Sequence, residues 1–253
     1  MITQSNLKTA FGPDFSPRVL KRISLNCFMN FGQVIFDILK FSRLSEEEKN
    51  RIVVIEGEDN LKKALRKGKG VLLFTAHYGN WEIGSYFFSK KGNFNVIARP
   101  LDNKLLEKEI LKLRTNLGAK IIYKHQATKH ILHSLRAKEM VAFLIDQNVL
   151  RSQALFVDFF GKKAATTPSL AAFFLKTKSP LLPAFCYPLS SYGYHLKICE
   201  PLEISLEGNH DQDMLKITQI CTNIIENQIR KNPNYWFWFH KRWKTRPYGE
   251  TKD

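Results

Sequence analysis

Acidic residues are scarce in this sequence relative to basic ones. The 253 residues include 23 aspartates and glutamates against 39 lysines and arginines, so the formal net charge is +16. Such an excess favours an anionic partner: nucleic acid, an anionic membrane surface or an acidic carrier protein. A generally basic proteome would give the same balance, so charge alone does not decide.

Cysteines are few, and long hydrophobic runs are absent. The cysteines form no C-x-x-C pair, which indicates buried thiols in a reducing compartment and not a disulfide framework. No run approaches the ~18 apolar residues needed to span a bilayer, and no signal-peptide pattern opens the chain. We therefore expect a soluble or peripheral protein. The four cysteines are Cys27, Cys186, Cys199 and Cys221.

Several common functional motifs are also missing. The sequence has no H-E-x-x-H, no P-loop and no G-x-G-x-x-G, and we expect neither a metal nor a cofactor. A hydrophobic content of 44% and an aromatic content of 12% exclude a disordered chain. The length suits one domain spanning residues 1–253.

Alternating helix and strand patterns predict an α/β fold. All-apolar strand interiors such as VLLF and VAFLI fit burial on both faces of a sheet. We expect a single domain with a largely parallel, mixed sheet flanked by helices, and amphipathic helices within residues 1–44. The predicted strands are 71–75, 94–98, 120–123, 140–145, 181–187 and 194–198.

The string HYGNWE at residues 77–82, just after the predicted strand 71–75, contains the residues best suited to catalysis. On a continuous helix His77 and Glu82 would be roughly 140° apart and could not meet. They can meet if Gly79 makes a sharp turn and Asn80 caps a new helix. Glu82 would then fold back and orient the imidazole of His77 as a general base.

No nucleophile accompanies this pair. There is no G-x-S-x-G elbow, and no cysteine is near the turn in sequence. We therefore expect His77 to deprotonate a hydroxyl brought by the substrate, which attacks an activated acyl group without an acyl-enzyme. The bare spacing H-x-x-x-x-E is a weak signal, whereas HYGNWE after an apolar strand is far more specific.

HYGNWE resembles the H-x-x-x-x-[D/E] box of the lysophospholipid acyltransferase superfamily. Its aromatic-Gly-Asn-Trp-Glu form is similar to the branch of lipid A lauroyl and myristoyl acyltransferases, which also contains phosphatidylinositol mannoside acyltransferases. Further blocks with similar patterns follow in the same order, over roughly residues 18 to 250. They are GKGVLLFTAHYGNWE, VIARPLDNKLLEKEILKLRTNLG, VAFLIDQNV, VDFFGKKAATTPSLAAFF and WFWFHKRWKTRP.

The resemblance implies acyl transfer from an acyl carrier protein or acyl-CoA thioester to a hydroxyl of an anionic, phosphorylated glycolipid such as a lipid A precursor. His77 would be the base and Glu82 its partner. The enzyme would work at the cytoplasmic face of a bacterial inner membrane, by peripheral contact, without specific nucleic acid. Alternatives are another lipid acceptor, water as acceptor (a thioesterase), or an inert basic membrane- or nucleic-acid-binding protein on the same fold.

Three residues that follow predicted strands are candidates for substrate binding. Arg99 precedes a proline that holds it extended, so it should project from the ligand edge of the sheet and bind a phosphate. A surface salt bridge is the alternative. Asp146 and Gln147 end another strand at the same edge. Asp146 would pair with Arg99, fix an acceptor hydroxyl, or be a buried structural residue.

Three more candidates are less specific. Phe160 and Gly161 would line the acyl channel or the wall of the site, although two adjacent phenylalanines more often belong to the core. Arg242, in the aromatic and basic segment 234–247, would contact an acceptor phosphate at a lipid headgroup interface. Alternatively, this segment would bind single-stranded nucleic acid, or it would be a core segment with a basic edge.

The N-terminus departs from the branch that the chain resembles. That branch commonly begins with a membrane-anchoring helix, whereas residues 17–42 carry Arg18, Lys21, Arg22 and Asp37 and cannot span a bilayer. The segment is apolar enough to lie in a membrane interface. Either anchoring is peripheral or an upstream part is not included in this chain.

Overall fold

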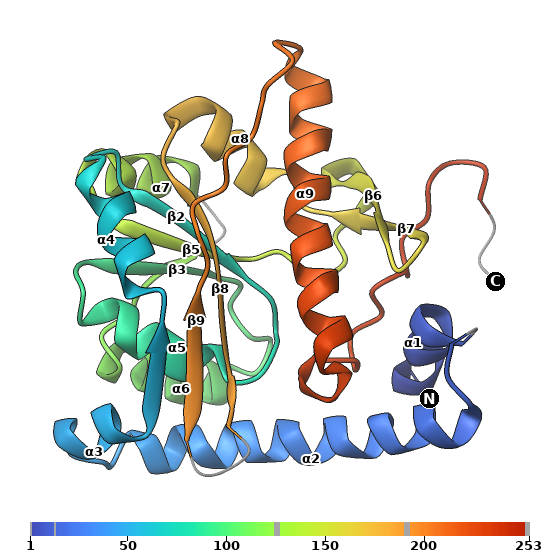
Figure 1. Ribbon diagram of the computed structural model, residues 1–253, viewed down its shortest axis with the longest axis horizontal. Helices are drawn as coiled ribbons and strands as arrows, with labels where there is room; N and C mark the ends of the chain where they lie inside the picture. The colour runs from blue at the N-terminus through green and yellow to red at the C-terminus, as the bar shows by residue number, and fades with distance from the viewer. Residues whose placement is uncertain (1, 13, 124–126, 190–192, 251–253) are drawn as a thin grey trace.

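The computed structural model describes residues 2–12, 14–123, 127–189 and 193–250. Its centre is a seven-stranded sheet in the order β1-β9-β8-β2-β5-β3-β4, in which every neighbouring pair is parallel except β8 and β9. This arrangement confirms the predicted α/β class with a mixed, largely parallel sheet (Figure 1). The strands are β1 (Val53–Glu56), β2 (Val71–Thr75), β3 (Phe94–Ala98), β4 (Lys120–Tyr123), β5 (Met140–Leu144), β8 (Leu181–Pro188) and β9 (Tyr194–Ile198).

Helices cover both faces of this sheet. The α-helices in the described ranges are α1 (Ile2–Phe11), α2 (Pro17–Phe41), α3 (Glu46–Arg51), α4 (Glu58–Arg66), α5 (Trp81–Ser89), α6 (Lys104–Asn116), α7 (Ala127–Arg136), α8 (Ser169–Thr177) and α9 (His210–Lys231). Short 3-10 turns occur at Arg151–Gln153 and Pro233–Tyr235. In these ranges, none of the helices has both the length and the apolar character needed to cross a bilayer.

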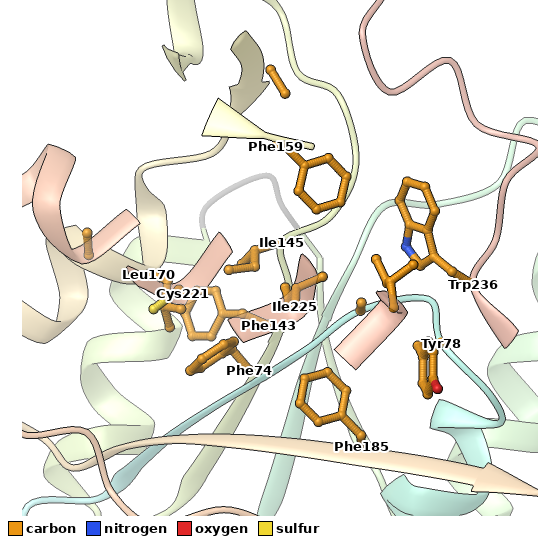
Figure 2. Close-up of a cluster of buried hydrophobic side chains, with 14 of the residues drawn as sticks. Phe74, Tyr78, Phe143, Ile145, Phe159, Leu170, Phe185, Cys221, Ile225 and Trp236 are labelled. Carbon is orange, nitrogen blue, oxygen red and sulfur yellow. The ribbon is translucent and has the colours of Figure 1, made fainter. Parts of the chain in front are cut away.

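The all-apolar strands result from burial on two sides. Along β2, Leu72 and Phe74 pack into one hydrophobic core, while Val71 and Leu73 pack into a second one. The first core lies toward α7, α8 and α9, and the second toward α4 and α5. Figure 2 shows part of the first core. Because side chains alternate along a strand, a central strand between two helical layers must be apolar at every position.

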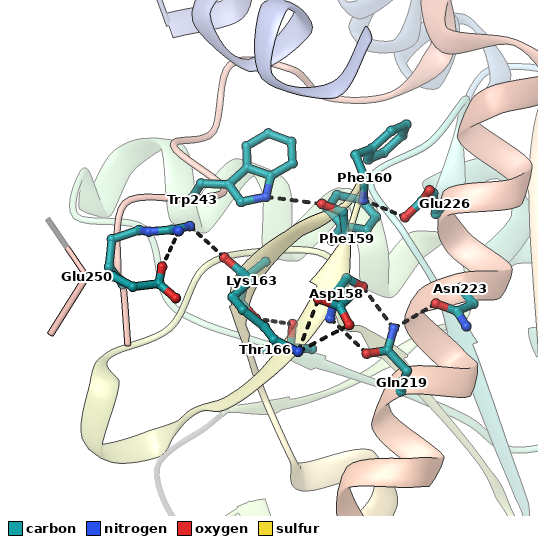
Figure 3. Close-up of polar contacts among 12 residues, drawn as sticks. Asp158, Phe159, Phe160, Lys163, Thr166, Gln219, Asn223, Glu226, Trp243 and Glu250 are labelled. Carbon is teal, nitrogen blue, oxygen red and sulfur yellow. Dashed lines mark hydrogen bonds and ion pairs between the residues drawn. The ribbon is translucent and has the colours of Figure 1, made fainter. Parts of the chain in front are cut away.

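A separate antiparallel hairpin was not predicted. It consists of β6 (Leu155–Phe159) and β7 (Lys162–Thr166). Hydrogen bonds tie it to α9: the backbone N–H of Asp158 donates to Gln219 Oε1 at 2.8 Å, and that of Phe160 donates to Glu226 Oε2 at 2.5 Å (Figure 3). The hairpin therefore packs beside α9 rather than extending the main sheet.

The long helix α2 runs along one side of the molecule (Figure 1). Ser16 caps its first turn by accepting the N–H of Val19, and Pro17 occupies the first position, as helix starts prefer. Its inner face buries Ile23, Cys27 and Val34. A capping box begins α3, since the side chains of Ser45 and Glu48 each accept the other's backbone N–H. Both helices thus begin at a serine whose side chain accepts a backbone N–H of the first turn.

Candidate active site

The HYGNWE segment forms the expected strand-turn-helix. After β2 the chain turns through Gly79, whose φ is +61° and whose missing Cβ would lie 2.1 Å from the carbonyl oxygen of Cys186. Only glycine fits such a position. Asn80 then caps α5, because its Oδ1 accepts the N–H of Ile83 at 3.2 Å. The turn leaves His77 at the carboxyl end of β2 with its side chain 22% exposed.

The imidazole of His77 is held by Asp146. Thr75 of β2 and Leu144 of β5 are partners in the parallel sheet, and His77 and Asp146 each lie two positions beyond them. His77 Nδ1 is 2.9 Å from Asp146 Oδ1, and the His77 backbone N–H donates to Oδ2 at 3.0 Å. The indole N–H of Trp236 donates to Oδ2 at 2.7 Å. Asp146 is thus a buried carboxylate surrounded by donors.

These contacts set the charge and the tautomer. Burial raises the pKa of Asp146, but the charge of His77 and the hydrogen bonds from His77 and Trp236 lower it more, so its pKa lies below the ordinary value. An ionised carboxylate can only accept hydrogen bonds, so the proton of a neutral His77 ring sits on Nδ1. The lone pair of Nε2 is then free to take a proton. Gln147 Nε2 lies 3.4 Å from it.

Glu82 has a different partner from the one expected. It accepts three hydrogen bonds from Arg114 on α6: Nε donates to Oε1 at 2.9 Å and to Oε2 at 3.1 Å, and Nη2 donates to Oε1 at 2.5 Å. The Trp81 indole donates to Glu82 as well, at 3.1 Å. The prediction that Glu82 orients the imidazole is therefore wrong. The carboxylate in the first turn of α5 meets α6, while the register of β2 and β5 brings Asp146 to His77. In the described part of the chain no hydrogen bond or ion pair joins Glu82 to His77, although the Trp81 indole that donates to Glu82 lies edge-on to the imidazole at 4.9 Å.

Burial and bidentate geometry give the Glu82–Arg114 pair a structural role. The Glu82 side chain is 10% exposed and that of Arg114 is 22% exposed. Burial lowers the pKa of Arg114, but the charge and hydrogen bonds of Glu82 raise it more, so its net shift is upward. Removing one charge of such a pair leaves the other poorly solvated.

We expect Glu82→Gln to lower the free energy of unfolding by about 1–3 kcal/mol, because Arg114 loses its charged partner in a largely buried place. Denaturant titration of the purified variant measures this loss. Glu47→Gln is the matched control, since Glu47 pairs with Arg51 in the open at 75% and 72% exposure. Its loss should stay below ~1 kcal/mol. Equal losses in both variants would contradict the structural role of the Glu82 pair.

A cavity of about 1150 Å³ opens beside these side chains. It exceeds the usual size of a small-ligand pocket, roughly 300–1,000 Å³. His77, Glu82, Arg114 and Gln147 all line it. Much of the remaining wall is apolar, and includes Leu73, Phe88, Phe94, Val96, Ala142 and Phe173. His77, whose Nε2 has only the long contact with the Gln147 amide at 3.4 Å among the described residues, therefore faces a large and mostly apolar cavity.

Comparison with known proteins decides the family. The family model described as bacterial lipid A biosynthesis acyltransferase matches residues 1–245. The chain belongs to this family. It is an acyltransferase, and the predicted resemblance to lipid A acyltransferases is confirmed.

Curated relatives of this acyltransferase share about a quarter of its residues. The lipid A biosynthesis palmitoleoyltransferase of Escherichia coli K12 is 25% identical over 252 residues, which cover 99% of this chain and 80% of the relative. A phosphatidylinositol mannoside acyltransferase of Mycobacterium tuberculosis H37Rv is 25% identical over 195 residues, covering 75% and 60%. Among solved structures, PlsC of Thermotoga maritima, a 1-acyl-sn-glycerophosphate acyltransferase, aligns with a TM-score of 0.44 at 12% identity and covers 93% and 97%.

Arg99 of the acyltransferase follows β3 and lines the cavity, as its place in the sequence suggested. Its side chain is 79% exposed and lies 3.6 Å from the Asp102 carboxylate. Asp146 does not pair with it, because that carboxylate is engaged by His77 and Trp236. Arg99 therefore stands at the rim as a cation that a solvent-exposed carboxylate engages only loosely.

Phe160 and Gly161 do not line the cavity, contrary to expectation. Phe160 is 5% exposed at the turn of the hairpin, where its ring packs against Phe11 at 5.1 Å and Trp238 at 6.0 Å. The guanidinium of Arg230 covers the same ring at 4.5 Å. Phe160 and its neighbour Phe159 belong to the core, which was the alternative for adjacent phenylalanines, whereas Gly161 is exposed at the turn of the hairpin.

Arg242 is also placed differently from the prediction. It is 1% exposed, and its guanidinium donates to the carbonyl of Ala165 at 2.6 Å and to Thr166 Oγ1 at 2.5 Å. Burial lowers the pKa of Arg242 to about 10, with Asp146 opposing the shift, so the group stays charged at neutral pH. It joins the C-terminal segment to β7 and does not reach a lipid phosphate.

Arg242→Ala should lower the free energy of unfolding by about 2–4 kcal/mol, since two buried acceptors lose their donor and a cavity opens above Phe159. Thermal or denaturant unfolding measures the change. Lys241→Ala, one residue earlier and exposed, is the control and should cost less than ~0.5 kcal/mol. A fully stable Arg242→Ala protein would show that the buried guanidinium does not join these segments.

Two cavity residues were missed from the sequence. Arg114 lies in the last turn of α6, inside the second block of the family resemblance, but nothing in that block singled it out. His240 lines the cavity and its Nε2 accepts the backbone N–H of Asn148 at 2.7 Å. Burial lowers the pKa of His240, against an opposing effect of Asp146, and favours the neutral ring that this bond needs. Within the described ranges, no cluster of His, Cys, Asp and Glu is placed to hold a metal ion.

Proposed function

We propose that this acyltransferase moves a fatty acyl chain from an acyl carrier protein or acyl-CoA thioester to a hydroxyl of a phosphorylated glycolipid of the lipid A precursor type. The observation that carries the proposal is His77, oriented by a buried Asp146, at the wall of a large apolar cavity. A base held by a carboxylate can activate a hydroxyl. The apolar wall suits an acyl chain, and the family membership supplies the reaction class.

His77 Nε2 takes the proton of the acceptor hydroxyl as its oxygen attacks the thioester carbonyl carbon. Asp146 stabilises the imidazolium that forms. The carbon–sulfur bond then breaks, and the imidazolium gives its proton to the leaving thiolate. His77 ends neutral, the acceptor gains one acyl group, and the donor leaves as a free thiol. Gln147, beside Nε2, is suited to hydrogen-bond the reacting oxygen.

Direct transfer is favoured over an acyl-enzyme by the state of the thiol that lines the cavity. Cys186 lines the cavity, but burial raises its pKa far above the ordinary value, so it remains a protonated and weak nucleophile. Its environment is apolar, and it is not the partner of His77. A hydroxyl from the acceptor is therefore the better candidate for the attacking group.

The rim of the cavity supports an anionic substrate. Arg99, Lys241 and Lys244 line it, which suits the phosphates of the acceptor or of the donor's pantetheine arm. The net charge of +16 suits an acidic carrier protein and anionic lipid. We place the reaction at the cytoplasmic face of the bacterial inner membrane, with the protein bound peripherally.

A second acceptor class deserves a test beside the first. Proteins named phosphatidylinositol mannoside acyltransferases match at the same 25% identity as the E. coli relative. A mannosylated phospholipid, like a lipid A precursor, brings a sugar hydroxyl and a phosphate. The cavity chemistry fits both.

The deciding experiment is to incubate the purified protein with labelled acyl-carrier-protein or acyl-CoA and an extracted lipid pool. Lipid A precursors, lysophospholipids and mannosylated phospholipids are offered together, and products are identified by mass. We expect a lipid A precursor heavier by one acyl group, absent with His77→Ala. If a different lipid is labelled, that lipid and not a lipid A precursor is the acceptor. Free fatty acid released without acceptor would make the protein a thioesterase.

A further inference from the structure

Helix α2 is apolar on two opposite faces. One face, with Ile23, Cys27, Val34 and Phe41, is buried. On the opposite face, large apolar side chains are exposed to solvent, whereas a surface helix usually carries polar and charged residues there. These are Leu25, Phe28, Met29, Ile35, Phe36 and Leu39, exposed by 45% to 65%.

The exposed side chains form one continuous stripe. At about 100° per residue, all six fall within an arc of roughly 120°. Gly32 lies in the middle of the same arc. The stripe is therefore a surface along the helix, and not a set of isolated apolar residues. We call it the α2 outer face.

Charge on and beside this face is of one sign. Arg18, Lys21 and Arg22 are exposed at its N-terminal end and Arg43 at its C-terminal end. In the described part of the chain none of these four forms an ion pair. The single acid of α2, Asp37, points elsewhere: it accepts hydrogen bonds from Gln33 and from the hydroxyl of Tyr194. Apolar residues between cations suit the boundary between lipid tails and anionic headgroups.

The α2 outer face continues into the cavity wall. Phe28 belongs to it, and its ring lies 4.5 Å from that of Phe239, which lines the cavity. Phe31, next to this pair, contacts Phe237 at 5.0 Å. The backbone N–H of Phe237 in turn donates to the carbonyl of His77 at 2.9 Å. An apolar path thus leads from the exposed helix to the catalytic turn.

A second link is made through the cap of α5. The side-chain amide of Asn80 donates to the carbonyl of Val34 in α2 at 3.4 Å. Asn26 of α2 likewise donates to Asn234, close to the aromatic segment, at 3.1 Å. Helix α2 thus contacts the cap of α5 and the aromatic segment, which lie on either side of His77. Its outer face therefore has a fixed position relative to the cavity.

We propose that the α2 outer face docks on an anionic lipid bilayer, seating its six apolar side chains among the upper acyl chains and its cations among the headgroups. The Phe28–Phe239 contact then places the cavity wall at the bilayer surface, where a lipid acceptor enters without crossing water. This inference rests on the proposed function for the identity of the acceptor. The docking itself concerns a surface outside the catalytic residues.

Vesicle flotation without any acyl donor tests the docking separately from the reaction. The full chain is mixed with vesicles of phosphatidylcholine alone or with phosphatidylglycerol added. We expect binding to the anionic vesicles that weakens with salt. Met29→Asp and Phe36→Asp should each lower the partition coefficient roughly tenfold or more, because a charge replaces an inserted apolar side chain.

Leu215→Asp is the matched control, since it puts the same charge on an exposed apolar position of α9. It should bind vesicles like the unaltered protein, and unfolding midpoints of all three variants show whether they fold. His77→Ala should also float normally, so a failure of the proposed chemistry would leave this result intact. Equal binding by Phe36→Asp and Leu215→Asp overturns the proposal. The proposal is also overturned if the unaltered protein binds no vesicles but forms a dimer that Phe36→Asp dissociates. In that case a second copy of the chain covers the α2 outer face.

Discussion

Replacing His77 by alanine is expected to lower the turnover number for acyl transfer by about 10²–10⁴, the usual contribution of general acid–base catalysis. The substitution removes the base beside the cavity but leaves Asp146 hydrogen-bonded to Trp236 and to the backbone N–H at position 77. Initial rates with a labelled thioester and a saturating acceptor measure the effect. The KM for the acceptor should change much less than kcat, because the lost interaction belongs to the transition state.

His210→Ala serves as the control for this substitution. His210 is 73% exposed at the start of α9 and touches neither the cavity nor the catalytic turn. Its variant should retain the rate of the unaltered protein. An active His77→Ala enzyme, with a rate within a few-fold of that control, would remove His77 from the mechanism.

Asp146→Asn should lower turnover by about as much, roughly 10²–10⁴, although it does not touch the reacting groups. The amide has the same shape but no charge, and its NH2 group can donate to Nδ1. That donation favours the tautomer in which Nε2 already carries a proton and cannot accept another. The imidazolium formed during transfer also loses its counter-charge. Rates must be expressed per folded protein, because three donors surround this carboxylate.

Glu82→Gln distinguishes the two candidate partners of His77. Its carboxylate pairs with Arg114, so the loss in turnover should be clearly smaller than that of Asp146→Asn. The opposite order, with Glu82→Gln nearly inactive and Asp146→Asn nearly normal, would restore Glu82 as the orienting group. Such a result would mean that the imidazole turns toward α5 when substrate is bound.

The local elements could be read from sequence because their signals are local. The strands at 71–75, 94–98 and 120–123 were predicted with the bounds that the structure has. Their apolar runs begin and end at turn residues or polar residues. By contrast, β1, β6 and β7 were not predicted, although they are as long as β4 or longer, because charged residues interrupt or flank their apolar stretches.

The partners within the site could not be read in the same way. Asp146 was a candidate from its place after a strand, but its contact with His77 depends on β2 and β5 being paired in register. Because Glu82 is only five residues from His77 in sequence, it was the predicted partner of the imidazole. In the structure Glu82 instead pairs with Arg114, which lies on a separate helix. Arg242 appeared to be a surface cation because its neighbours are basic, whereas its burial depends on the packing of the hairpin against the C-terminal segment.

Nitrogen NMR of the protein labelled with ¹⁵N-histidine tests the central claim most directly. Loss of one resonance pair in His77→Ala assigns that residue among the seven histidines. Near neutral pH we predict a protonated Nδ1 and an unprotonated Nε2 for His77, a pattern that Asp146→Asn disrupts and Glu82→Gln preserves. A proton on Nε2 in the unaltered enzyme, or a tautomer that responds to Glu82 and not to Asp146, would contradict the account.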